Sequence, residues 1–511
     1  MSTGTPVFKP YYQNQLVALP PSLDELVPKG HPARVLDEII NKINILPLML
    51  EYKLKGRSSY HPLMLLKVIL FGYVNNIYSS RKLENACREN VNFMWLSGMS
   101  FPDHNTINRF RGVRLKDSLR AIFEEVVKLL AEENVLSLED VYTDGTKIEA
   151  NANKYTFVWK KSIQKSKERM EIALKEIWKY AQTVAKEEDD IADTPDLSNL
   201  NQEKVQTTVD KLNKVLAKNP SIDKKIKAKL TYITKNYPNN IQKYEQQEEI
   251  LKDRNSCSKT DKDATFMRMK DDHMKNGQLK PGYNIQISTS NQYIVNFTVH
   301  PNPTDTTTLP EHIEQHKESY GDYPKRVTAD AGYGSEENYT FLENTGTDAF
   351  IKYGLFDKQQ KKSNIDKVPF AVDKLYYNKE GDYFVCPMGQ QMKCIGVFTQ
   401  QTSTGFQQQL KKYKAQNCSG CPMRGVCHNS KDDRIIQVNE NLNRQRDKAY
   451  KLLNSDVGIE KRKKRCHDVE TVFGNIKQNH MFRRFMLRGK EKVSIEWGLL
   501  AIAQNIRKKA A

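Results

Sequence analysis

The sequence predicts a multidomain α/β protein, and three observations support this prediction. The chain has 511 residues, which is longer than one ordinary domain. Short β-type runs that end in turn residues occur within 136–154 and 263–375. Helical patterns fill the regions before and between these runs. We therefore expect an α/β core with a helical N-terminal domain, a helical insertion and a small cysteine-rich insertion.

The domain boundaries follow from changes in these patterns. Apolar side chains repeat at helical spacing among Lys and Glu between the two groups of β-type runs, which predicts a helical or coiled-coil insertion. Cysteines gather after the second group. The expected parts are 1–135 for the N-terminal domain, 136–154, 263–375 and 436–511 for the α/β core, 155–262 for the helical insertion and 376–435 for the cysteine-rich insertion.

Residues 1–135 combine short helices and tight turns with a basic composition. Ser22 and Glu25 have the spacing of a capping box at the first helix. This pattern is typical of a helix-turn-helix, whose reading helix would start after Asp103. Because Asn and Arg reach base edges bidentately, the candidate reading residues are Asn105, Asn108, Arg109 and Arg111. The alternative is a plain helical bundle with solvated polar residues.

Within the core, two aspartates occur in the same local context. Asp144 and Asp330 each follow a short β-type run, and glycine comes directly afterwards or one residue later. A carboxylate at a strand end projects into the crevice where α/β sheets bind ligands. The alternative for either residue alone is a simple Asp-Gly turn. We expect the first strand to end at Asp144-Gly145, and 283–290 and 293–300 to form a hairpin about Asn291.

Glu470 is the third candidate carboxylate. Its helix carries an apolar stripe of Val469, Val472, Phe473 and Ile476. Glu470, Gly474 and Lys477 lie together beside that stripe. Gly inside a helix costs about 1 kcal/mol relative to Ala, so we interpret Gly474 as leaving room for something bulky beside Glu470. The alternative is an exposed Glu470 that pairs with Lys477 or Lys463.

The three carboxylates together suit phosphodiester chemistry. Cleavage and strand transfer need an activated water or 3′-hydroxyl and a stabilised leaving oxygen, and two divalent ions about 4 Å apart supply both. Mg²⁺ and Mn²⁺ prefer oxygen ligands. We therefore expect Asp144, Asp330 and Glu470 to hold two Mg²⁺ or Mn²⁺ ions.

Four stretches of sequence stand out in chain order. They are YTDGTKIEANANKY, KPGYNIQIS, ADAGYGSEENY and the pattern R-x4-E-x2-FG-x2-K followed by FRRFMLRG. Together they resemble the DDE transposases of bacterial insertion sequences, and among these the insertion sequence eleven-eighty-two family. The resemblance covers nearly the whole chain. The spacing from Glu470 to Lys477 is a signature of the group, whereas the aspartate motifs are specific through their order.

The resemblance implies an RNase H-like core and assigns roles to individual residues. Asp144, Asp330 and Glu470 would be the metal-binding triad, and Arg465 and Lys477 would hold DNA phosphates beside it. One departure concerns Arg465. The related pattern has Tyr and Arg seven and four residues before the Glu, and this chain has Lys463 and Cys466 there.

The cysteine-rich insertion has the spacing of a zinc knuckle. Tetrahedral Zn²⁺ takes four thiolate or imidazole ligands. The candidates are Cys386, Cys418, Cys421 and Cys427, with Cys394 and His428 as alternates. We expect a structural Zn²⁺ site, and similar cysteine clusters occur in the family that the chain resembles. The alternative is a set of reduced thiols or a redox pair.

The chain carries a large excess of positive charge. Lys and Arg number 80 and Asp and Glu number 62, so the net charge is +18 at pH 7. Such an excess favours a polyanionic partner, of which nucleic acid is the commonest. Arg483, Arg484 and Arg488 follow the Glu470 helix and are candidate phosphate contacts, with a solvated helix face as the alternative.

The composition also argues against a membrane protein. The longest apolar run, 63–74, is much shorter than the ~20 residues of a membrane span. The first residues lack the pattern of a signal peptide. Together with the resemblance to bacterial transposases, this leads us to expect a cytoplasmic, nucleoid-associated bacterial protein.

These observations predict a DNA transposase. It would bind the double-stranded ends of its own element, cut them and join them to target DNA, as a homodimer or a higher oligomer. One rival is a metal-dependent nuclease of the same fold. The other is a non-catalytic, zinc-stabilised DNA-binding regulator.

Overall fold

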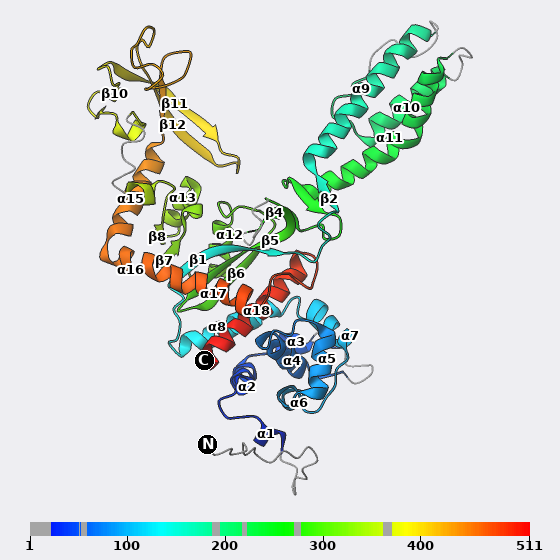
Figure 1. Cartoon of the computed structure of the whole chain (residues 1–511), viewed down its shortest axis with the longest axis vertical. Helices are drawn as coiled ribbons and strands as arrows, with labels where there is room; N and C mark the ends of the chain where they lie inside the picture. Colours follow the sequence, from blue (N-terminus) through cyan, green and yellow to red (C-terminus); the bar gives the residue numbers. More distant parts are fainter. Residues whose placement is uncertain are drawn as a thin grey trace, which may run out of the picture. The chain divides into compact units, whose positions relative to one another are not determined.

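The computed structural model describes residues 22–50, 52, 59–185, 195–216, 222–269, 277–360 and 370–511. The chain divides into two compact units. Figure 1 labels the helices and strands of both. The first contains Met1–Val126 together with Leu499–Ala511, and the second contains Val127–Gly498. The last residues of the chain therefore belong with the N-terminal helices, although the sequence had placed 436–511 in the α/β core.

The first unit is helical. Helix α4 is almost entirely buried, and α2 and α6 pack against it. The Nδ1 atoms of His31 and His61 cap α2 and α4 by accepting backbone N–H groups, and a proline follows each histidine at the first helical position. The helices are α1 (Leu23–Leu26), α2 (Pro32–Lys42), α3 (Leu46–Leu50), α4 (Pro62–Val74), α5 (Ser80–Glu89), α6 (Val91–Ser97), α7 (His104–Arg109) and α8 (Leu119–Glu132), which continues into the second unit.

The second unit is built on a mixed six-stranded sheet. Its strands are β1 (Asp140–Glu149), β4 (Thr265–Arg268), β5 (Leu279–Ser290), β6 (Tyr293–His300), β7 (Arg326–Ala329) and β8 (Asp348–Ile351). The order is β4-β5-β1-β7-β8, and β6 also pairs with β5. Strand β5 runs antiparallel to β1 and β6, whereas β7 is parallel to β1 and β8. The predicted hairpin is confirmed, with Asn291 and Gln292 at positive φ in its turn.

The prediction that the first strand ends at Asp144-Gly145 is wrong, because β1 continues to Glu149. Gly145 lies inside the strand and pairs with Gln286 of β5. A Cβ atom at position 145 would collide with the side chains of Gln286 and Asp305. The glycine therefore permits a close approach inside a strand and does not form a turn.

The helices that follow β6 in the sequence pack around this sheet. Helix α12 packs against β6, α13 and α15 against β8, and α16 against β7. The apolar stripe of the Glu470 helix is buried as predicted. These helices are α12 (Leu309–Tyr320), α13 (Glu336–Asn344), α14 (Phe356–Gln359), α15 (Glu440–Asn454), α16 (Asp456–Arg465) and α17 (Thr471–Gly474). Helix α18 (Lys490–Ala510) follows them, and its residues from Leu499 on belong to the first unit.

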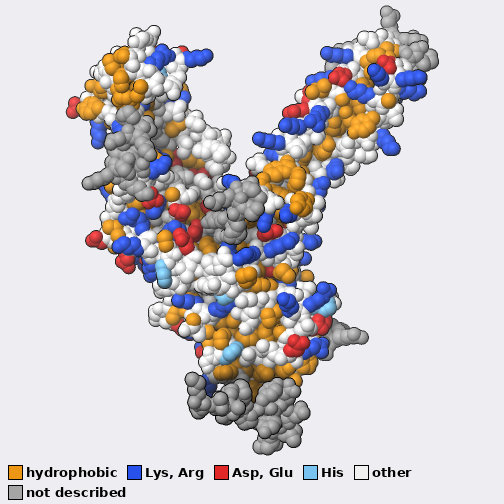
Figure 2. Space-filling model, in the orientation of Figure 1, with side chains coloured by type: hydrophobic (Ala, Val, Ile, Leu, Met, Phe, Trp, Pro, Cys, Tyr) orange, Lys and Arg blue, Asp and Glu red, His pale blue; other side chains and the backbone are white. Residues whose placement is uncertain are grey.

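Three long helices lie between β1 and β4 in the sequence. They are α9 (Lys160–Val184), α10 (Gln202–Leu216) and α11 (Lys224–Leu251), and they share one apolar core that includes Leu174, Trp178 and Leu212. The short strands β2 (Phe157–Trp159) and β3 (Ser256–Ser258) pair where the three-helix segment begins and ends. Many Lys and Arg side chains lie on the face of this segment that is visible in Figure 2.

The cysteine-rich region forms a second sheet, which the sequence did not predict. It is antiparallel and contains β9 (Tyr377–Asn378), β10 (Tyr383–Val385), β11 (Gln391–Gln401), β12 (Gln407–Lys414) and β13 (Ile435–Val438). Among the described helices of the whole chain, none combines the length and the apolar character that crossing a bilayer requires.

Candidate active site

The two aspartates lie where neighbouring strands separate. Strands β1 and β7 pair in parallel up to Thr143 and Ala329; Asp144 is the next residue of β1, and Asp330 directly follows the end of β7. Each carboxylate accepts a hydrogen bond from the N–H of the following residue, at 2.8 Å for Asp144 and 2.7 Å for Asp330. The ladder therefore places both side chains at one position along the sheet.

Glu470 reaches the same place from a helix with a π-helical turn. That turn spans Cys466–Glu470, between α16 and α17. A π-helical turn contains one residue more than an α-helical turn and is frequent at functional sites. Arg465, five residues before Glu470, therefore comes beside it, with Nη2 3.0 Å from Glu470 Oε1. The extra residue brings Arg465 beside Glu470, although Arg465 lies one position away from the Arg that the resemblance leads us to expect.

The three carboxylates line one open cleft of about 330 Å³. Arg465 and Lys477 also line it, as the resemblance implies, and so does Gly474. A Cβ atom on Gly474 would have no neighbour within 4 Å, so this part of the wall is open. The sequence analysis did not identify three further lining residues, Thr146, Phe473 and Gln478. Thr146 could have been found, because side chains two apart on a strand share a face.

Arg465 supplies positive charge between two of the carboxylates. Its Nη1 atom lies 3.6 Å from Asp144 Oδ2, and its Nη2 atom bonds Glu470. The side chains of Arg465 and Asp144 are each 13% exposed, whereas that of Glu470 is 51% exposed. Nη1 is buried and has no hydrogen-bond partner among the described residues. It forms an ion pair with the Asp144 carboxylate instead.

Tyr333 lies just behind the cleft, in the 3₁₀ turn Ala331–Tyr333 that follows Asp330. Burial raises the pKa of its hydroxyl well above the usual 10, and the negative charges of Asp305, Asp144 and Asp330 act in the same direction. The hydroxyl therefore stays protonated and donates a hydrogen bond to Gln286 Oε1.

The donor set of the cleft fits hard divalent cations, since it offers the oxygen atoms of three carboxylates. As arranged, no three His, Cys, Asp or Glu side chains of the described residues are close enough together to enclose a metal ion. In the cleft, the guanidinium of Arg465 provides the positive charge.

The three arginines after the Glu470 helix are exposed and also bind the chain itself. Arg484 donates to the carbonyls of Ala150 and Ala152, and Arg488 donates to that of Asn151. Arg483 donates to Gln478 Oε1 at 2.8 Å. Arg484 and Arg488 thus hold the segment that follows β1 in place by hydrogen bonds to its carbonyl groups.

The predicted reading helix begins as expected, with Asp103 capping α7 through the N–H groups of Asn105 and Thr106. Asn105, Asn108 and Arg109 are exposed. Arg111 differs, because it is only 2% exposed in the π-helical turn Phe110–Arg114. Its guanidinium donates to Tyr78 O at 2.7 Å and to Asn108 Oδ1 at 3.0 Å. The assignment of Arg111 to base reading is therefore corrected to an internal structural role.

Most of the predicted zinc ligands line one small hollow. Cys386, Cys418, Cys421, Cys427 and His428 line one hollow of about 20 Å³, and Cys394 does not. The Sγ atoms of Cys386 and Cys418 accept backbone N–H groups at 3.3 and 3.4 Å. Cys427 Sγ accepts from Arg434 Nη1 at 2.9 Å.

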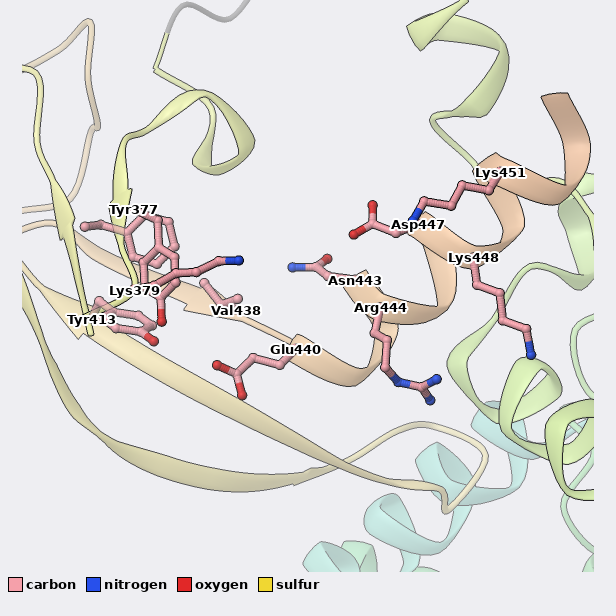
Figure 3. Close-up of a pocket in the computed structure, with 11 residues that line it drawn as sticks. Tyr377, Lys379, Tyr413, Val438, Glu440, Asn443, Arg444, Asp447, Lys448 and Lys451 are labelled. Atoms are coloured by element: carbon pink, nitrogen blue, oxygen red, sulfur yellow. The ribbon is translucent and has the colours of Figure 1, made fainter. Parts of the chain in front are cut away.

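A larger hollow of about 730 Å³ lies between the second sheet and α15 (Figure 3). Tyr377, Lys379 and Tyr413 line it from the sheet, and helix α15 supplies further polar residues, including Glu440 and Arg444. These last two already pair with Lys411 and Glu343 respectively.

Comparison with known proteins connects both units to one class of enzyme. Residues 385–510 match the family described as "Transposase DDE domain", and residues 21–112 match "Transposase domain (DUF772)". The first match includes Glu470, Arg465 and the cysteine cluster. No curated protein and no solved structure matches the chain. The two family matches support a DNA transposase of the DDE kind, an enzyme that acts on DNA and uses divalent metal.

Proposed function

We propose that this protein cleaves the ends of its own mobile element and joins them to target DNA, using Asp144, Asp330 and Glu470 as the metal-binding residues of an RNase H-like core. One observation carries the proposal. Three carboxylates from distant parts of the chain line the same cleft. The sheet order, with antiparallel strands on one side of β1 and parallel strands on the other, supports the RNase H-like assignment.

The three carboxylates would hold two Mg²⁺ or Mn²⁺ ions. When bound, such ions supply an activated water or 3′-hydroxyl and stabilise the leaving oxygen. Both cleavage and joining are in-line displacements at phosphorus, so one site serves both. No side chain of the cleft is then required as a general base.

Arg465 and Lys477 would bind the phosphates that flank the scissile bond. Both side chains line the cleft, and Arg465 Nη1 makes no hydrogen bond among the described residues. Gly474 keeps the adjacent wall open for the DNA backbone. Arg483, Arg484 and Arg488 would extend the phosphate-binding surface from the same segment.

Asn105, Asn108 and Arg109 would contact the terminal sequence of the element from α7. Their exposure on a capped helix in a transposase-like unit supports this assignment. Because two element ends must be joined together, the active form would be a dimer or a higher oligomer on double-stranded DNA. Such a protein would work at the bacterial nucleoid.

The cysteine cluster would hold one structural Zn²⁺. Four thiols and one imidazole line the same small hollow. Backbone N–H groups directed at Sγ atoms stabilise thiolates, the form that Zn²⁺ binds. This Zn²⁺ would stabilise the fold and would take no part in the chemistry of the acidic cleft, because thiolates bind Zn²⁺ whereas carboxylates bind Mg²⁺.

Asp144→Asn tests the catalytic assignment. The variant should neither cut nor join labelled element-end DNA in Mg²⁺, and it should bind the same DNA with unchanged affinity in a gel-shift assay. Asp348→Asn is a matched control, because Asp348 is an exposed aspartate on β8 of the same sheet. Unchanged cleavage by Asp144→Asn would refute the proposal. Nicks without joined products from the native protein would favour the nuclease instead.

A further inference from the structure

One face of β5 and β6 in the central sheet carries polar side chains that are nevertheless buried. Six side chains that alternate along β5 and β6 form this layer, and each is at most 8% exposed. The register pairs them as Asn284 with His300, Gln286 with Thr298, and Ser288 with Asn296. Polar strand faces normally meet water, and buried polar groups are retained only when hydrogen bonds satisfy them. A satisfied buried network makes its surroundings rigid.

Gln286 connects this layer to both catalytic strands. Its Cα pairs with that of Gly145, the residue after Asp144. Its side-chain Oε1 accepts a hydrogen bond from Tyr333, the last residue of the turn that begins after Asp330. The β1–β7 ladder ends at Thr143 and Ala329, one residue before each aspartate. The bond from Tyr333 to Gln286 therefore links the two strands beyond the end of their ladder.

Asp305 sets the orientation of the Gln286 amide. Asp305 Oδ1 accepts from Gln286 Nε2 at 2.8 Å and from Asn284 Nδ2 at 2.7 Å. The amide nitrogen of Gln286 thus faces Asp305, and its oxygen faces Tyr333. Asp305 belongs to the loop between β6 and α12 and does not line the cleft. The missing side chain at Gly145 leaves the space that the Gln286 and Asp305 side chains fill.

We propose that Tyr333, Gln286 and Asp305 are positioning residues that hold Asp144 and Asp330 at the separation that two divalent cations require. This inference rests on the proposed function. None of the three would touch metal or DNA. They would act through the backbone next to each aspartate, and the chain of bonds runs Asp305–Gln286–Tyr333 across β5.

Tyr333→Phe removes one hydroxyl and keeps the buried ring. Tyr339→Phe is the matched control, because Tyr339 is also buried and its hydroxyl makes one hydrogen bond, to Ile351 O at 2.9 Å, away from the cleft. Mn²⁺ binding to the full chain without DNA is measured by electron paramagnetic resonance. The Mg²⁺ concentration for half-maximal cleavage is measured separately from the maximal rate.

Tyr333→Phe should weaken Mn²⁺ binding and raise the half-maximal Mg²⁺ concentration about tenfold or more, the usual effect of losing a group that orients metal ligands. Tyr339→Phe should leave the Mn²⁺ affinity and the half-maximal Mg²⁺ concentration unchanged. Its melting temperature should fall about as much as that of Tyr333→Phe. Asp305→Ala is the second variant, since it opens space in a half-buried loop, and it should show the same weakening. The variant that combines Tyr333→Phe with Asp305→Ala should lose no more Mn²⁺ affinity than the weaker-binding single variant, because Tyr333 and Asp305 both act through Gln286.

Equal metal dependence in Tyr333→Phe and Tyr339→Phe would overturn the inference, and so would additive losses in the double variant. Asp144→Asn separates this failure from failure of the proposed function. If Asp144→Asn abolishes Mn²⁺ binding and cleavage while Tyr333→Phe matches its control, only the positioning role is wrong. If Asp144→Asn keeps both, the metal site itself is wrong.

Discussion

The guanidinium of Arg465 lies 3.0 Å from Glu470 Oε1 because a π-helical turn separates the two residues. In a continuous α-helix, residues five apart point in different directions. The turn brings them together and also brings Arg465 within 3.6 Å of Asp144. A single cation from the protein therefore lies between two of the three carboxylates that are proposed to bind metal.

Arg465→Gln should bind Mn²⁺ about fivefold more tightly than the native protein in the absence of DNA. A partly exposed ion pair is worth about 1 kcal/mol, and about 1.4 kcal/mol corresponds to a tenfold change in affinity. Cleavage of element ends should fall, because Arg465 also supplies the phosphate donor. Isothermal titration with Mn²⁺ checks the first effect. Lys463→Gln, an exposed charge change nearby, is the control, and equal or weaker Mn²⁺ binding by Arg465→Gln would contradict the competition.

Gly474 offers a test of where DNA approaches the cleft. Gly474→Ala fits without a clash and should stabilise its helix by up to about 1 kcal/mol. Gly474→Leu should fold as well but should lower cleavage at least tenfold by blocking the DNA backbone, with Mn²⁺ binding retained. The alanine variant serves as the control for loss of the glycine. If the leucine variant cleaves like the alanine variant, DNA does not pass beside position 474.

Much of the candidate site was predictable because it depends on local patterns. Short β-type runs followed by aspartate pointed to Asp144 and Asp330, although β1 does not end at Asp144, and a helical apolar stripe indicated the helix that carries Glu470. The hairpin about Asn291 was predictable from two β-type runs with a short turn. These features depend on residues close together in the chain.

Features that depend on tertiary contacts were not predictable. The sequence suggested that Gly145 ends a strand. In the structure a glycine is required at position 145 because the side chains of Gln286 and Asp305, from distant segments, occupy the space that a Cβ atom would need. Arg111 appeared to be a base-reading residue, because spacing does not reveal that its side chain turns inward to Tyr78. The extra residue before Glu470 appeared to be a departure, because periodicity assumes 3.6 residues per turn and a π-helical turn does not follow it.

The cysteine cluster predicts zinc in the purified protein. Elemental analysis should find one Zn²⁺ per chain after purification without added metal, and a strong chelator should lower the melting temperature. Cys418→Ser with Cys421→Ser should lose the zinc, because both thiols line the small hollow. Cys394→Ser is the control, since Cys394 is outside it. A zinc-free protein whose melting is unaffected by chelator would show that the thiols pack without metal.

Arg109 and Arg111 should separate DNA recognition from folding, although only one residue lies between them. Arg111→Met removes a buried guanidinium and leaves Tyr78 O and Asn108 without their donor, so unfolding should become easier by about 2–4 kcal/mol. Arg109 is exposed, so Arg109→Gln should change stability by less than about 0.5 kcal/mol. It should weaken binding to element-end DNA, as measured by fluorescence anisotropy at several salt concentrations. If Arg111→Met melts like the native protein and loses DNA binding instead, Arg111 belongs to the DNA surface, and α7 must present a different face from the one that Asn105, Asn108 and Arg109 define.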